Sequence, residues 1–156
     1  MSSHNLYNNF VGNILKSAHT VHEIKYHLVW SMKYRKKLLY KQSYQEKLKE
    51  LVAEIAERYW YVIHRLGTDG DHIHILLQAV PSAGVPEIVK TIKSITAREM
   101  YRSFPELKKL MWGTSLWEQG YFVRTVGDET TAEMIKRYIE KQGKVRGVKA
   151  EQLRFI

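Results

Sequence analysis

Hydrophobic and polar residues alternate between His22 and Trp30. A period of two is typical of a strand, because successive side chains of a strand point to opposite faces. We therefore expect a half-buried strand here, preceded by a polar leader over residues 1–20 that is mobile or forms a short helix. The expected inner face carries Ile24, Tyr26, Leu28 and Trp30, and the outer face carries Glu23, Lys25 and His27.

A helical period replaces the alternation in two later stretches. The pair Ser43 and Glu46 has the spacing of a capping box, which predicts a helix over residues 44–59. Pro86 is a favourable first helical residue, and Pro105 should end the second helix, predicted over residues 87–102. The apolar positions of the two helices are Leu48, Leu51, Val52, Ile55 and Tyr59, and then Ile88, Ile92, Ile95 and Met100.

The remaining pattern predicts a hairpin, one further strand and a last helix. Residues 61–66 and 71–80 flank the turn Gly67-Thr68-Asp69-Gly70 and read as paired strands. The stretch 112–126 should hold the fourth strand. Thr130 and Glu133 have capping-box spacing, which predicts a helix that runs through Tyr138 and Gln142 and stops near Gly143.

The resulting element order is β-α-β-β-α-β-α. Four antiparallel strands with two helices on one face form the ferredoxin-like (RRM-like) α+β plan. The last helix, which carries Tyr138, is then an addition to that plan. The predicted division is a leader over residues 1–20 and one domain over residues 21–156.

Composition narrows the class of partner. The chain has 156 residues, a formal net charge of +9 and no cysteine. Such a charge favours a polyanion, most simply nucleic acid, and the lack of cysteine excludes disulfides and thiolate metal sites. No stretch has the roughly 18 consecutive apolar residues of a membrane span, and the N-terminus lacks a signal-peptide pattern. We expect a cytoplasmic protein without a membrane partner.

The tripeptide His72-Ile73-His74 is the strongest chemical signal in the chain. Residues i and i+2 of a strand share a face, with Cβ atoms roughly 7 Å apart, so two imidazoles can converge on one metal ion. Ile73 should point into the core and leave the histidines on the polar, accessible face. Asp71 is either an outer partner of a ligand histidine or simply a turn residue. The competing interpretation is a pair of half-buried histidines that their neighbours satisfy.

Tyr138 and Gln142 lie four residues apart and share a face of the last predicted helix. Each has an ordinary alternative, as a core aromatic residue and as a solvated surface amide. If their face meets the histidine face, however, a hydroxyl nucleophile and an amide oxygen reach the same ion.

At this point the chain resembles the single-tyrosine HUH transposases, the TnpA-like (IS200-like) enzymes of insertion sequences that move as single-stranded DNA. The resemblance covers roughly residues 20–145. Its matching segments are Tyr26-His27-Leu28-Val29-Trp30 with Lys33-Tyr34-Arg35, Asp71-His72-Ile73-His74-Ile75-Leu76, Leu116-Trp117 with Gly120-Tyr121-Phe122, and Lys136-Arg137-Tyr138-Ile139-Glu140-Lys141-Gln142.

This resemblance implies a DNA transposase that cleaves and rejoins single-stranded DNA through a 5′-phosphotyrosine intermediate. Tyr138 would be the nucleophile, and His72, His74 and Gln142 would bind Mg²⁺ or Mn²⁺, with no nucleotide cofactor. It also implies a homodimer with composite active sites, DNA hairpins near the element ends as the recognised feature, and action at the nucleoid.

Five basic residues are candidates for contact with DNA phosphates, although each could equally be part of a solvated surface. They are Arg35, Lys36, Lys37, Lys90 and Lys93.

Three rival functions remain open. A non-catalytic RNA- or DNA-binding module would use the same sheet, with surface aromatic residues stacking on bases. A domesticated relative could process repeated chromosomal hairpins with the same chemistry. A metal-dependent nuclease would use activated water instead of Tyr138.

Overall fold

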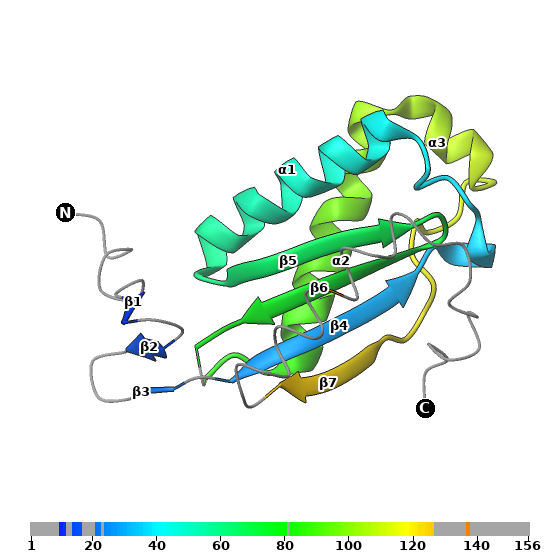
Figure 1. Ribbon diagram of the computed structural model, residues 1–156. Coiled ribbons are helices and arrows are strands. Elements are labelled where there is room, and N and C mark those ends of the chain that lie inside the picture. The colour runs from blue at the N-terminus through cyan, green and yellow to red at the C-terminus, as the bar shows by residue number, and fades with distance from the viewer. Residues whose placement is uncertain are drawn as a thin grey trace.

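The computed structural model describes residues 10–11, 14–16, 21–22, 24–80, 82–126 and 137. Within them, a four-stranded sheet is covered on one face by the helices α1 and α2 (Figure 1). The predicted helix around Tyr138 and Gln142 lies outside the described residues. No helix in the described ranges has the length and apolar character needed to cross a membrane.

The four-stranded sheet has the strand order β5-β6-β4-β7, and all its neighbouring strands are antiparallel. The two strands that follow the helices lie at its edges, which is the ferredoxin-like arrangement. The predicted α+β fold class is therefore confirmed. The strands are β4 (Lys25–Ser31), β5 (Val62–Asp69), β6 (His72–Gln78) and β7 (Phe122–Val126).

The two long helices build the core with one face of the sheet. They are α1 (Gln42–Tyr59) and α2 (Val85–Ser103). The predicted inward positions are buried or partly buried, except Tyr59, which is 40% exposed. Their buried partners on the sheet include Leu28, Trp30, Ile73, Ile75 and Leu77.

Helix α1 begins before the predicted capping box. Gln42 is already helical, Lys41 is the N-cap, and no side chain caps the first turn. Ser43 Oγ is buried and makes no hydrogen bond within the described chain. Glu46 instead accepts a hydrogen bond from Gln42 Nε2 at 2.8 Å. The capping-box prediction was wrong because Ser43 lies inside the helix, where its hydroxyl cannot reach the free amides of the first turn.

A short helix that the sequence did not predict follows α2. Pro105 ends α2 as expected, but it also opens α3 (Pro105–Leu110). Proline is suited to the first turn of a helix because the amide it lacks has no intrahelical partner there. The same residue thus separates two helices.

The expected leader contains short strands in its described part. Strands β1 (Phe10–Val11) and β2 (Ile14–Lys16) lie within it, and together with β3 (Val21–His22), just after it, they form a separate antiparallel sheet in that order. The alternative of a short helix is wrong for these residues. His22 belongs to β3 and not to the long strand, which begins at Lys25.

The hairpin turn is tighter than predicted. Asp69 pairs with His72, so only Gly70 and Asp71 connect the strands, and Gly67 to Asp69 belong to β5. Gly70 has a φ of +57°, and a Cβ there would collide with the Tyr40 ring. The turn therefore requires glycine.

Candidate active site

The histidine pair lies on the sheet face opposite the helices. Ile73 points into the core, whereas the rings of His72 and His74 lie with their centroids 4.8 Å apart. This confirms the shared face. The prediction of accessibility was wrong: His72 is 3% exposed and His74 is fully buried. Strand β4 differs from the prediction in the same way, since Lys25 and His27 are buried on this face too.

Asp71 orients His72. His72 Nδ1 lies 2.6 Å from Asp71 Oδ1, and Arg35 Nε lies 3.3 Å from the other carboxylate oxygen. Because the carboxylate can only accept, the imidazole donates its Nδ1 proton, and the neutral ring then has its lone pair on Nε2. That Nε2 makes no hydrogen bond to the described residues, and an Asp69 carboxylate oxygen lies 3.8 Å away. Asp71 therefore makes the contact that an outer partner of a metal ligand would make, besides occupying the turn.

A third histidine, His27 of β4, belongs to the same group. Its Nε2 lies 3.1 Å from His74 Nδ1, and the two rings stack at 16° with centroids 5.4 Å apart. Sequence reasoning placed His27 on the polar face but gave it no role. The missing information was the pairing of Val29 with His74, which sets His27 diagonally beside the metal candidate.

Burial keeps the rings of His27 and His74 neutral. It lowers the pKa of His74 to about 2, with smaller contributions from the charges of His72 and His27. Burial and the nearby Arg124 lower the pKa of His27 to about 4. Burial alone would raise the pKa of Asp71, but the contacts with His72 and Arg35 hold it below its usual value. Neutral imidazoles beside an ionised carboxylate are the protonation states that metal ligation requires.

These pKa values predict that the metal-free protein loses stability in mild acid. Below about pH 6.5 a histidine in the unfolded chain becomes protonated, whereas His27 and His74 in the folded protein stay neutral. The free energy of unfolding is therefore highest above about pH 7 and falls as the pH decreases. Between pH 7.5 and 5 the expected loss is about 2 kcal/mol for each ring. Urea unfolding at the two pH values in chelator measures it. A His27→Phe variant should lose about half of this dependence, and equal stabilities of the unaltered protein at both pH values would contradict the assignment.

The described part of the site supplies two candidate metal ligands and not a complete set. The side chains there include no group of three or more histidines or carboxylates arranged to hold an ion. Two imidazoles fit a site that takes its other ligands from an amide oxygen, water and substrate phosphate. The predicted third ligand, Gln142, and the predicted nucleophile, Tyr138, lie outside the described residues.

The basic loop after β4 lies close to the histidines. Arg35 is held by Asp71, and the Lys36 ammonium lies 4.0 Å from the centre of the Trp112 ring. Lys37 is exposed. Arg35 thus contacts Asp71, which contacts His72, and Lys36 and Lys37 directly follow Arg35 in the sequence.

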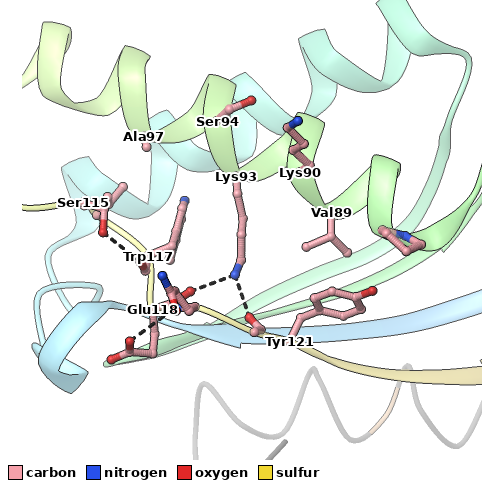
Figure 2. A pocket seen from close by; sticks show the side chains of 13 residues that line it. Val89, Lys90, Lys93, Ser94, Ala97, Ser115, Trp117, Glu118 and Tyr121 are labelled. Atoms are coloured by element: carbon pink, nitrogen blue, oxygen red, sulfur yellow. Dashed lines mark hydrogen bonds between the residues drawn. The ribbon is translucent and has the colours of Figure 1, made fainter.

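The other two basic candidates lie on α2, beside a pocket of about 470 Å³ between this helix and residues 115–121 (Figure 2). Lys90 is exposed. The Lys93 ammonium instead donates to the backbone carbonyls of Glu118 at 2.8 Å and Gly120 at 2.6 Å. Burial lowers the pKa of Lys93, and the charge of Glu118 partly offsets this effect. Lys93 therefore secures the loop that leads into β7.

The sequence of the chain is similar to those of two transposases of insertion sequences. The ISDra2 transposase TnpA of Deinococcus radiodurans is 36% identical over 122 residues, which cover 78% of this chain and 86% of the relative. The transposase for insertion sequence element IS200 of Salmonella typhimurium is 30% identical over 134 residues, or 85% of each chain.

Two solved structures share the fold. A crystallised candidate transposase from Deinococcus radiodurans R1 superposes with a TM-score of 0.67 at 37% identity, over 81% of this chain and 96% of that one. A REP-associated tyrosine transposase bound to a REP hairpin has a TM-score of 0.56 at 10% identity, over 75% and 64% of the two chains. The latter likeness concerns the fold alone. The family model described as "Transposase IS200 like" matches residues 20–142, and the chain therefore belongs to the family of IS200-like transposases, which are DNA-processing enzymes.

Proposed function

We propose that this protein cleaves and rejoins single-stranded DNA at the ends of an insertion sequence through a 5′-phosphotyrosine intermediate on Tyr138. The observation that carries the proposal is the buried His72–His74 pair, with each ring oriented by a separate polar neighbour in an IS200-like chain. A non-catalytic binding module would leave these contacts without a purpose. The direct test is a covalent protein–DNA adduct after incubation with single-stranded element ends and Mn²⁺ or Mg²⁺.

His72 and His74 would hold the divalent ion through their Nε2 atoms, together with Gln142. When bound, the ion would polarise the scissile phosphate and stabilise the 3′ leaving oxygen. Neutral ligands suit this task because they leave the charge of the ion undiminished. Asp71 and His27 would keep the two imidazoles in the required tautomers and orientations.

Tyr138 would form the new bond. Its phenolic oxygen attacks phosphorus while the bond to the 3′ oxygen breaks, and the phenolic proton balances the 3′ hydroxyl that is released. Phenolate is a good leaving group, so a free 3′ hydroxyl can reverse the step on another strand. The chemistry is strand transfer and needs no nucleotide cofactor.

The proposed substrate is single-stranded DNA with subterminal hairpins, acted on in the cytoplasm at the nucleoid. The net charge of +9 suits such a polyanion, and the REP-associated transposase with a similar fold was solved with a hairpin bound. We also propose a homodimer in which the histidine pair of one subunit receives the tyrosine of the other.

His27 gives a test of the metal site. His27→Phe keeps an aromatic ring beside His74 but removes the nitrogen that would accept the Nδ1 proton of a metal-binding His74, so Mn²⁺ affinity should fall about 10- to 100-fold. His27→Gln is the matched control, because its amide oxygen can still accept and should preserve more of the affinity. Titration calorimetry without DNA measures both. Equal Mn²⁺ affinities for the Phe variant and the unaltered protein would show that His27 does not orient a ligand.

A further inference from the structure

Two exposed aromatic side chains pack together at the end of β4, away from the core. Trp112, just after α3, is 66% exposed, the largest fraction among the bulky hydrophobic residues that the structure describes. Tyr34 is 50% exposed, and its ring centroid lies 5.2 Å from that of Trp112. Core packing does not explain the position of either ring.

Two ammonium groups lie over these rings. Lys36 Nζ is 4.0 Å from the centre of the Trp112 ring, and Lys33 Nζ is 5.6 Å from that of Tyr34. We call Trp112, Tyr34, Lys33 and Lys36 the aromatic platform. Aromatic faces beside cations match an unpaired nucleotide, because the rings can stack on its base while the ammonium groups contact its phosphates.

The backbone holds the platform in an uncommon conformation. Tyr34, Arg35 and Trp112 have φ values of 58°, 51° and 54°. Bulky side chains rarely adopt positive φ, and each such residue is conformationally strained. Backbone hydrogen bonds compensate, including Arg35 to the Met32 carbonyl at 2.9 Å. Backbone strain of this kind is often found at functional sites, where it positions a side chain for contact with a ligand.

The platform connects directly to the candidate active site. Arg35 follows Tyr34 and pairs with Asp71, which in turn contacts His72. The backbone is tied at the same place, since the Met32 amide donates to the Asp71 carbonyl at 2.7 Å. A strand that stacks on the platform would therefore continue past the turn that precedes the histidines.

We propose that the aromatic platform stacks on an unpaired base of the single DNA strand that leads to the His72–His74 site. This inference rests on the proposed function for the identity of the strand. The lysine ammonium over the Trp112 ring favours a polyanionic strand as the occupant. Stacking tolerates any base, so the platform would support strand binding without specifying sequence.

The test compares Trp112→Ala with Trp112→Phe, using fluorescence anisotropy of a labelled oligothymidine and a blunt duplex in chelator. The Ala variant should bind the single strand about tenfold or more weakly and bind the duplex normally, whereas the Phe variant should keep most of the affinity. Tyr34→Ala should act in the same direction as Trp112→Ala. Tyr59→Ala, an exposed aromatic residue at the far end of α1, is the matched control and should change neither affinity.

Salt dependence separates stacking from charge. Trp112→Ala removes no charge and should leave the slope of log K against log salt unchanged, whereas replacing Lys36 and Lys37 with Ala should make it shallower. Circular dichroism checks that the variants are folded, which we expect because Trp112 is largely exposed. An unchanged single-strand affinity of the Ala variant, or an equal loss on duplex, would overturn the proposal.

The adduct assay distinguishes this outcome from failure of the transposase proposal. If adducts form and Trp112→Ala binds single strands normally, only the platform is refuted. If no adduct forms but the selective loss is seen, the platform stands as a single-strand binding site and the transposase proposal falls.

Discussion

Tyr138→Phe should abolish both the covalent adduct and strand cleavage, by about 10⁴-fold or more, while hairpin binding persists. The substitution removes one oxygen and retains the ring, so it deletes the nucleophile with little change in shape. Denaturing electrophoresis of labelled single-stranded ends, with Mn²⁺ present, measures adduct and cleavage together. Anisotropy with the same DNA in chelator measures binding.

A second tyrosine variant controls for a nonspecific effect of replacing tyrosine with phenylalanine. Tyr121 is partly buried and lines the pocket between α2 and residues 115–121, and Tyr121→Phe should leave adduct formation unchanged. Adducts formed by the Tyr138→Phe variant would refute the nucleophile. Cleavage without adducts in that variant would instead favour a nuclease that activates water.

The periodicities of the chain predicted the fold because each element buries one consistent face. Ile88, Ile92 and Met100 recur at helical spacing and are all buried in α2. The alternation before Trp30 identified β4 but gave the wrong exposure for its second face and for Ile24, which precedes β4 and is exposed. Alternation reports which residues share a face, and the burial of that face depends on contacts that a local pattern does not contain.

The contacts of the candidate site that are local in sequence were predictable, and those between distant residues were not. His72 and His74 share a face because their spacing along one strand requires it. The contact of Asp71 follows from its neighbouring position at the turn. The contact between His27 and His74 spans 47 positions and depends on the register of β4 against β6, which no local pattern determines. Similarly, the packing of Trp112 on Tyr34 depends on α3, a helix that the sequence did not reveal.

The double substitution His72→Ala and His74→Ala should eliminate Mn²⁺ binding and reduce cleavage to background. With both imidazoles removed, one amide ligand and water cannot retain a labile divalent ion. Calorimetry without DNA measures the affinity. His64→Ala is the matched control: it removes an imidazole that contacts Gln78 at 2.9 Å on the same sheet and should leave Mn²⁺ affinity intact. Unchanged affinity in the double variant would refute the metal site.

The same variant tests whether the active sites are composite. Mixed with a Tyr138→Phe chain, it should restore about one working site per heterodimer, because the histidines of one chain would receive the tyrosine of the other. If each site were built from a single chain, every site in the heterodimer would lack either the metal ligands or the nucleophile. Recovered adduct formation on mixing, with neither variant active alone, is therefore the expected result. An inactive mixture that contains verified heterodimers would show that Tyr138 serves the histidines of its own chain.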